Sequence, residues 1–101
     1  MTYGVIVRVA GDVADYDQLH EATVERTGGD LGGLLLHIGR ATEEGFEIIE
    51  VWDTPEQFDR CNREVIWPLM AEIGAPRPAA EPVVVEFTPR GLVLAGTRIV
   101  R

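Results

Sequence analysis

The sequence predicts an α+β fold of the ferredoxin-like kind, with the element order β-α-β-β-α-β and a four-stranded antiparallel sheet. Four segments rich in β-branched residues predict the strands, and two segments with apolar residues at helical spacing predict the helices. The two halves also resemble each other, because VIVRVAGDVADYDQL and EIIEVWDTPEQFDRC both run from a strand through an aspartate into a helix. A chain of 101 residues has the length of one domain. We expect its core to span about residues 3–88, with residues 89–101 as a tail or an extra strand.

The first half of the chain supplies two strands and one helix. Residues 2–9 alternate in polarity, which predicts the first strand. A helix is expected over residues 14–26, where Tyr16 begins an apolar stripe. A glycine-rich break then leads to a second strand over residues 33–40. That break lacks a lysine and precedes a strand, so it is not a phosphate-binding loop.

The second half begins with a third strand over residues 45–53, joined to the second strand by the short loop ATEEG. A second helix should start at Thr54, because Thr54, Pro55 and Gln57 together form a capping box with proline in the first turn. Pro68 lacks a backbone donor, so we expect a kink or break near it.

The end of the chain supplies the last strand of the predicted sheet. The second helix should end at Gly74, and the apolar segment VVVEF over residues 83–87 predicts the fourth strand. A further apolar run in the tail is expected to pair as an additional strand.

The composition excludes several classes of function. The net charge of −8 argues against nucleic acid or an anionic membrane as a partner, and no apolar run has the length of a membrane span. The start of the chain lacks the features of a signal peptide, so we expect a cytoplasmic protein. The chain contains neither lysine nor serine, which excludes a serine nucleophile and a lysine Schiff base. The two histidines lie on different elements, so no metal site is expected.

Both faces of the predicted sheet are apolar, although two helices can cover only one of them. Apolar residues occupy both alternating sets of positions in the first three strands. An uncovered apolar face would exceed what a soluble monomer normally exposes. The sequence therefore predicts a homodimer in which the sheets of two chains pack against each other.

One residue of the third strand does not fit its surroundings. Glu50 shares a face with Phe46, Ile48 and Trp52, and its charge lies in the middle of that face. The opposite face carries charges only near its ends, so we expect that face to pack under the helices and the Glu50 face to line a cavity.

His37 is the predicted partner of Glu50. A hairpin loop of two or four residues centred on Glu43 and Glu44 places the two side chains opposite each other, whereas a three-residue loop separates them. A buried carboxylate beside an imidazole is a tunable general acid and base, but it is equally a way to satisfy a structural pair. Both interpretations stay open.

Other polar residues are weaker candidates for a site. Tyr3 and Arg8 are auxiliary candidates, with the face of Arg8 depending on the register. His20, four residues after Tyr16, is expected to be a half-exposed packing residue. Cys61 falls on the apolar stripe of the second helix, where a buried inert thiol is the favoured interpretation.

The segments GLLLHIGR, GFEIIEVWDTPEQFDR and WPLMAEIG closely resemble the dimeric α/β-barrel superfamily, which includes proteins similar to antibiotic biosynthesis monooxygenases. The resemblance covers about residues 3–88. It implies a ferredoxin-like fold and a homodimer with a pocket in each chain. Positions that would serve haem degradation in this superfamily carry Cys61 and Ala71 here, so that activity is not expected. The positions that carry His and Tyr in cyclase-type members align with Phe46, Tyr3, Cys61 and a residue near Trp67, so the His–Tyr dyad of those members is not preserved either.

Together these observations predict a cofactor-independent small enzyme that acts on an apolar aromatic or polyketide-like molecule by acid/base chemistry, such as cyclisation or isomerisation. His37 and Glu50 would be catalytic, and the pocket would be lined by Tyr3, Phe46, Ile48 and Trp52. The alternatives are a cofactor-free monooxygenase and a non-catalytic dimer that binds a small molecule.

Overall fold

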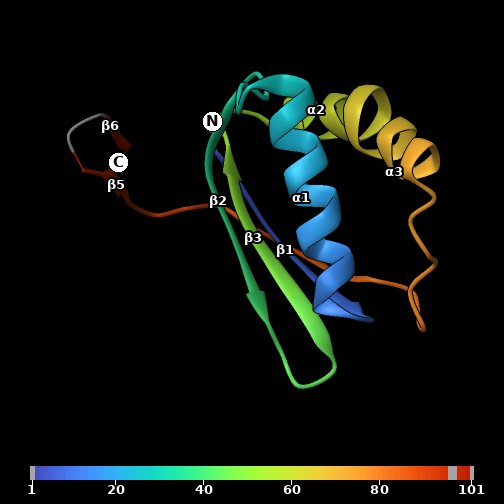
Figure 1. Ribbon diagram of the computed structural model, residues 1–101. Helices are drawn as coiled ribbons and strands as arrows, with labels where there is room; N and C mark the ends of the chain where they lie inside the picture. The colour runs from blue at the N-terminus through green and yellow to red at the C-terminus, as the bar shows by residue number, and fades with distance from the viewer. Residues whose placement is uncertain (1, 96–97, 101) are drawn as a thin grey trace.

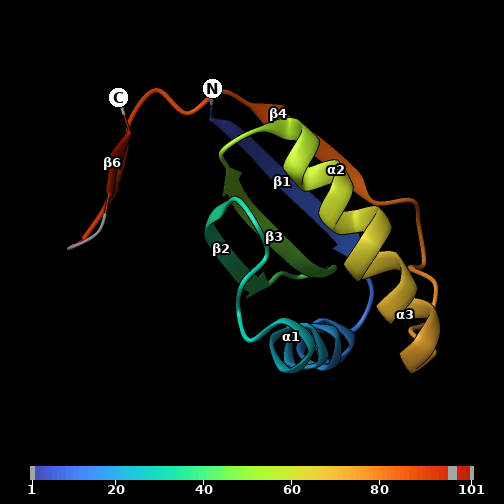
Figure 2. The same cartoon turned by 90° about the horizontal axis from the view of Figure 1, so that it is seen from above.

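The computed structural model describes residues 2–95 and 98–100 and confirms the ferredoxin-like fold. The core elements follow the predicted order: β1 (Tyr3–Ala10), α1 (Val13–Thr27), β2 (Leu34–Ala41), β3 (Gly45–Trp52), a second helical segment and β4 (Val83–Phe87). The four strands form one antiparallel sheet in the order β2-β3-β1-β4. Both helical segments lie against one face of this sheet (Figures 1 and 2).

The helix ends follow from local sequence signals. The Asp12 side chain accepts a hydrogen bond from the backbone N–H of Ala14 and so caps the start of α1, while Gly28 in the left-handed region ends that helix. The capping box predicted at Thr54 is confirmed, with the Thr54 hydroxyl and the Gln57 side chain each bound to the backbone of the other residue.

The second helical segment changes its hydrogen-bonding pattern near Pro68, where a kink or break was predicted. It consists of α2 (Pro55–Cys61), a π-helical turn η1 (Asn62–Ile66) and α3 (Trp67–Ile73), and it ends at Gly74. The backbone N–H of Trp67 reaches the carbonyl of Asn62, five residues back. This wider turn directly precedes Pro68, the residue that lacks a backbone N–H to donate.

The face of the sheet that packs under the helices is the one that carries Glu50, so the predicted assignment of faces was wrong. On this face Val5, Trp52 and Cys61 form the buried core cluster, with partly buried apolar residues of α2 and η1 packed against it. The physical reason is that this face carries Trp52, which is 2% exposed and whose large apolar side chain gains enough on burial to outweigh one polar side chain. The polar group is accommodated by hydrogen bonds instead of being turned to solvent.

The opposite face of the sheet is open. It carries Ile38, Val85 and Phe87, whose exposed fractions are 45%, 38% and 38%. At one end of this face, the guanidinium groups of Arg8 and Arg40 donate from Nε to the two carboxylate oxygens of Glu47, each at 2.9 Å. These two hydrogen bonds lower the pKa of Glu47 below its ordinary value.

The tail adds strands, but they do not join the main sheet. β5 (Leu92–Leu94) and β6 (Arg98–Val100) pair with each other as a separate two-stranded ribbon. This ribbon extends away from the helices (Figure 1). Within residues 2–95 and 98–100, no helix has the length and apolar character needed to cross a membrane.

Candidate functional site

His37 and Glu50 form a direct pair across strands β2 and β3. The hairpin closes with Glu43 and Glu44 as its two loop residues, because the backbone N–H of Thr42 donates to the Gly45 carbonyl and Ala41 pairs with Phe46. This register places His37 opposite Glu50, as predicted for a two-residue loop. The His37 Nδ1 atom lies 2.7 Å from Oε2 of Glu50. Their side chains are 22% and 14% exposed, so the pair is largely shielded from water.

Trp52 donates the second hydrogen bond to the Glu50 carboxylate. Its indole N–H donates to Oε1 at 3.1 Å, while His37 occupies Oε2. Trp52 itself is only 2% exposed and packs edge-on against Phe58 of α2. An ionised carboxylate can only accept hydrogen bonds, so Nδ1 of His37 carries a proton and, in the neutral ring, Nε2 is left as an acceptor.

Tyr16 of α1 supplies the donor for that acceptor. Its phenolic oxygen lies 2.6 Å from Nε2 of His37, so the hydroxyl donates to a neutral imidazole. Burial and then the negative charges of Glu50 and Asp17 raise the pKa of Tyr16, which keeps the phenol protonated. The result is a continuous hydrogen-bonded chain, Tyr16–His37–Glu50–Trp52, that we call the relay.

Tyr16 is the member of the relay that was not predicted as a site residue. Its ring lies directly over Gly39 of β2, where even a single added methyl group would overlap the phenol. It also tilts against Phe46, with ring centroids 5.5 Å apart. The glycine in the middle of an otherwise apolar strand was the available sequence signal, since such a glycine often marks close approach of another group.

His20 lies at the outer end of the relay, one helical turn after Tyr16. Its ring stacks on Tyr16 and on His37, with centroid distances of 5.5 and 5.3 Å and interplanar angles of 15° and 14°. Its Nδ1 atom lies 3.5 Å from the Tyr16 oxygen. His20 is therefore a packing residue, as predicted. The sequence did not indicate that its ring packs on two members of the relay, Tyr16 and His37.

The remaining predicted residues lie in different surroundings. Ile48 pairs with Gly39 in the middle of the Glu50 face and is half-buried. Tyr3 packs on Phe58 and its hydroxyl donates to Glu86 at 2.7 Å. Burial and this bond to Glu86 raise the pKa of Tyr3. Tyr3 is therefore bonded to the edge strand β4 and not to the relay.

Arg8 and Cys61 do not take part in the relay. Arg8 lies on the open face with Glu47, so it is not an auxiliary to Glu50. Burial and the nearby charge of Glu50 raise the pKa of the Cys61 thiol to about 11. A thiol with this pKa is protonated at neutral pH, which agrees with the predicted inert core cysteine.

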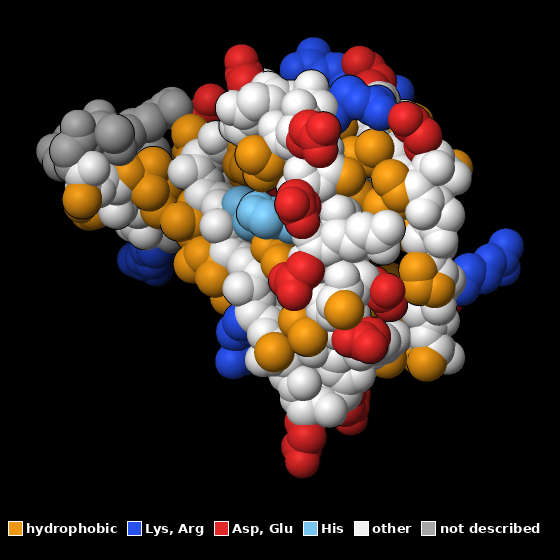
Figure 3. All heavy atoms as spheres, viewed as in Figure 1, with side chains coloured by type: hydrophobic (Ala, Val, Ile, Leu, Met, Phe, Trp, Pro, Cys, Tyr) orange, Lys and Arg blue, Asp and Glu red, His pale blue; other side chains and the backbone are white. Residues whose placement is uncertain are grey.

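The relay is approached from the side where α1 faces β2. Figure 3 shows histidine side chains at the surface there, next to several acidic side chains. A surface hollow lies on this side along α1, lined by Asp17, His20, Glu21, Val24 and Glu25. Within the part of the chain that the structure describes, no group of three His, Cys, Asp or Glu side chains is arranged to hold a metal ion.

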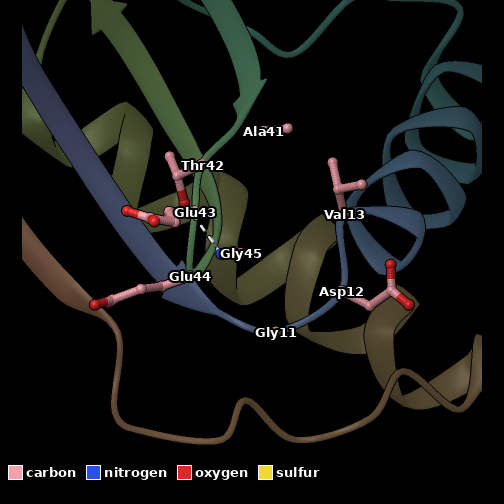
Figure 4. A pocket seen from close by; sticks show the side chains of 8 residues that line it. All are labelled: Gly11, Asp12, Val13, Ala41, Thr42, Glu43, Glu44 and Gly45. Carbon is pink, nitrogen blue, oxygen red and sulfur yellow. Dashed lines mark hydrogen bonds between the residues drawn. The ribbon is translucent and has the colours of Figure 1, made fainter.

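A second hollow, of about 410 Å³, lies at the end of the sheet far from the relay. It is formed where the β1–α1 turn meets the β2–β3 hairpin (Figure 4). Asp12 lies on one side of it and Glu43 and Glu44 on the other, and none of the relay residues lines it.

Comparison with known proteins identifies the fold. No family model and no curated protein matches the chain. Among solved structures, the "putative Antibiotic biosynthesis monooxygenase" of Chloroflexus aurantiacus J-10-fl is 24% identical, with a TM-score of 0.70 over 95% of this chain and 100% of the other. Rv0793 of Mycobacterium tuberculosis is 16% identical, with a TM-score of 0.65 over 94% and 99%. The "Putative antibiotic biosynthesis monooxygenase" of Nitrosomonas europaea is 14% identical, with a TM-score of 0.66 over 88% of this chain and 90% of the other. The expected structural likeness to proteins similar to antibiotic biosynthesis monooxygenases is therefore confirmed at the level of fold.

Proposed function

We propose that this protein is a small cofactor-independent enzyme that moves a proton on an apolar aromatic or polyketide-like molecule. The observation that carries the proposal is the hydrogen-bonded relay from Tyr16 through His37 to Glu50, with distances of 2.6 and 2.7 Å. A purely structural pair needs only His37 and Glu50. The additional hydrogen bond to Tyr16 connects the pair to the accessible side of the molecule. A short, shielded chain of this kind is suited to general acid/base catalysis.

The proposed proton transfer starts at the Tyr16 oxygen. A bound substrate with an acidic O–H or activated C–H group gives its proton to this oxygen, while the Tyr16 proton passes to Nε2 of His37. The imidazolium that forms is stabilised by the Glu50 carboxylate, and Trp52 holds that carboxylate in place through its indole N–H. The substrate is left as an enolate or phenolate, which can cyclise or isomerise before the proton returns.

Apolar side chains near the relay support an apolar, flat substrate. Phe46 lies beside Tyr16, and the rings of Tyr16, His20 and His37 are nearly parallel. Aromatic molecules stack favourably on such ring surfaces.

A second candidate function is cofactor-free oxygenation, in which the same relay produces a phenolate that molecular oxygen then oxidises. It is favoured by the description of the structural neighbours from Chloroflexus and Nitrosomonas as antibiotic biosynthesis monooxygenases. The two functions share the residues and differ in whether oxygen is consumed.

Activity on a panel of phenols and polyketide-like ketones, followed by product mass and oxygen uptake, tests both. Replacing Glu50 with Gln or Tyr16 with Phe should lower turnover by roughly 10²-fold or more, because each removes a proton-transfer group. Glu43→Gln on the exposed hairpin is the control and should leave turnover unchanged. Full turnover in a folded Glu50→Gln protein would exclude the catalytic role. If no compound turns over and the variants only lose stability, the result favours the alternative in which the His37–Glu50 pair is structural.

We also propose that two chains pack through the open face of the sheet. The support is the set of exposed apolar side chains on that face, which includes Ile38, Val85 and Phe87. Ile38 and Val85 lie in one cross-strand row with Ile49 and Ile6 between them. A two-fold arrangement lets the same patch cover itself in the partner, as isologous interfaces do.

A further inference from the structure

We propose that His20 is the residue through which the relay exchanges protons with water, so that the proton path runs from solvent through His20 and Tyr16 to His37. The catalytic meaning of this path rests on the function proposed above, although the path itself can be measured without any substrate. It assigns a positioning and proton-exchange role to an exposed histidine on α1.

Each inner member of the relay already has its hydrogen-bonding partners. Both oxygens of Glu50 are occupied, one by Nδ1 of His37 and one by the indole of Trp52. The remaining ring nitrogen of His37 is occupied by the Tyr16 hydroxyl. Water can therefore reach the His37 proton only by breaking one of these bonds or by exchange through the Tyr16 oxygen.

The Tyr16 oxygen lies between two imidazoles. It is 2.6 Å from Nε2 of His37 and 3.5 Å from Nδ1 of His20. The second distance is long for a hydrogen bond, but His20 is exposed and its ring can rotate toward the phenol on a fast timescale. Catalytic hydrogen bonds are often long in a free protein and shorten during the reaction. The i,i+4 spacing on α1 keeps the two side chains adjacent in either case.

The other end of His20 faces solvent. It lines the surface hollow on α1, where the neighbouring side chains are Asp17, Glu21, Val24 and Glu25. Figure 3 shows histidine and acidic side chains together at this surface. His20 is thus the more exposed of the two histidines and is open to proton exchange with water.

The transfer step balances without any added reactant. A proton from water binds Nε2 of His20, and the proton on Nδ1 of His20 passes to the Tyr16 oxygen. The original Tyr16 proton passes at the same time to Nε2 of His37. The net result is one more proton on His37, with Tyr16 unchanged and His20 returned to a neutral ring in its other tautomer. The reverse sequence discharges His37 after a substrate proton has been taken up.

The test is the rate at which the His37 ring gains and loses its proton. In protein labelled with ¹⁵N-histidine, relaxation dispersion of the His37 ring nitrogens reports this rate at the pH where the ring is half protonated. His20→Phe keeps an aromatic ring in the stack but has no ring nitrogen to carry a proton. We expect it to slow the exchange by about tenfold or more, a smaller factor than the roughly 10²-fold effect of a directly acting acid or base. Glu21→Gln changes a neighbour in the same hollow and should leave the rate unchanged.

Every outcome decides the proposal. A slower rate in His20→Phe with an unchanged rate in Glu21→Gln supports it. An unchanged rate in a folded His20→Phe protein overturns it, because water then reaches His37 by another route. An equal slowing in Glu21→Gln also overturns it, since the acidic rim and not His20 would control exchange. If His20→Phe does not fold, His20→Gln is measured by the same criteria. None of these rates depends on turnover, so a failure here is distinct from a failure of the proposed reaction.

Discussion

The phenolic oxygen of Tyr16 lies 2.6 Å from Nε2 of His37, and this contact joins helix α1 to strand β2 across 21 positions of sequence. It turns a His37–Glu50 pair into a chain that reaches the accessible side of the molecule. The contact depends on a close approach of the Tyr16 ring to the strand, which only a residue without a side chain permits. Gly39 is that residue.

Replacing Gly39 with Ala should therefore displace Tyr16 and break its bond to His37. The added methyl group would occupy the same space as the phenol, and overpacking of this kind costs about 1–3 kcal/mol of the free energy of unfolding. Urea unfolding measures the loss of stability, and ¹⁵N shifts of the His37 ring report the broken bond. Gly11→Ala is the matched control, because a methyl group there meets no atom within 4 Å. Unchanged His37 shifts in Gly39→Ala would contradict this account of Tyr16.

The two tryptophans should respond very differently to replacement by phenylalanine. Trp52 is buried and donates to Glu50, whereas Trp67 is 58% exposed. Trp52→Phe should lower the free energy of unfolding by about 1–3 kcal/mol, because it leaves one Glu50 oxygen without its donor and opens a small void. Trp67→Phe should change it by about 0.5 kcal/mol or less. Equal effects in thermal unfolding would show that the indole N–H contributes nothing to holding the carboxylate.

Cys61 should make the protein lose stability in alkaline solution. Its pKa is raised in the folded state to about 11 from an ordinary 9.0, so between these values the unfolded chain releases a proton that the folded chain keeps. The contribution is fully present below pH 9 and is lost as the pH rises toward 11. Urea unfolding from pH 8 to 11 should show a shallower decline in Cys61→Ala than in the wild type. Tyr3 and Tyr16, whose pKa values are also raised, leave a residual decline in both proteins.

Alkylation provides a second check on the same thiol. At pH 8 the folded protein should react slowly with iodoacetamide and rapidly once unfolded, because the reactive thiolate is suppressed by burial. Rapid labelling of the folded protein would be inconsistent with a buried, protonated Cys61.

The open face of the sheet should be sensitive to charge. Ile38→Asp places a carboxylate on the edge strand β2 within the proposed interface, where it would be desolvated without a partner. We expect the variant to behave as a monomer in analytical ultracentrifugation at micromolar concentration, where the wild type is a dimer. Val24→Asp on α1 is the control, since Val24 and Ile38 are equally exposed at 45% in the single chain. A wild-type monomer, or a dimer in Ile38→Asp, would argue against this interface.

Local signals were sufficient for the order of elements and for several of their ends. The capping box at Thr54 and the glycine end at residue 74 are each determined by neighbouring residues, so the sequence predicts them well. The segment ATEEG predicts a hairpin but is compatible with two, three or four loop residues, and the structure shows two. The hairpin then determines that His37 faces Glu50, because a strand alternates with a period of two.

Long-range packing decided which face of the sheet the helices cover, which the alternation of residues along the strands could not. Both faces of the sheet are apolar, so only the packing of α2 on Trp52 selects the face that the helices cover, and the predicted choice was the wrong one. On the same face α1 places Tyr16 against Gly39, and this contact brings Tyr16 and His20 to the pair. The sequence by itself determined that His37 and Glu50 lie on the two adjacent strands of one hairpin, and the register seen in the structure places the two side chains opposite each other. Only the tertiary structure decided that the pair is part of a longer relay, because Tyr16 comes from a helix whose docking depends on the whole core.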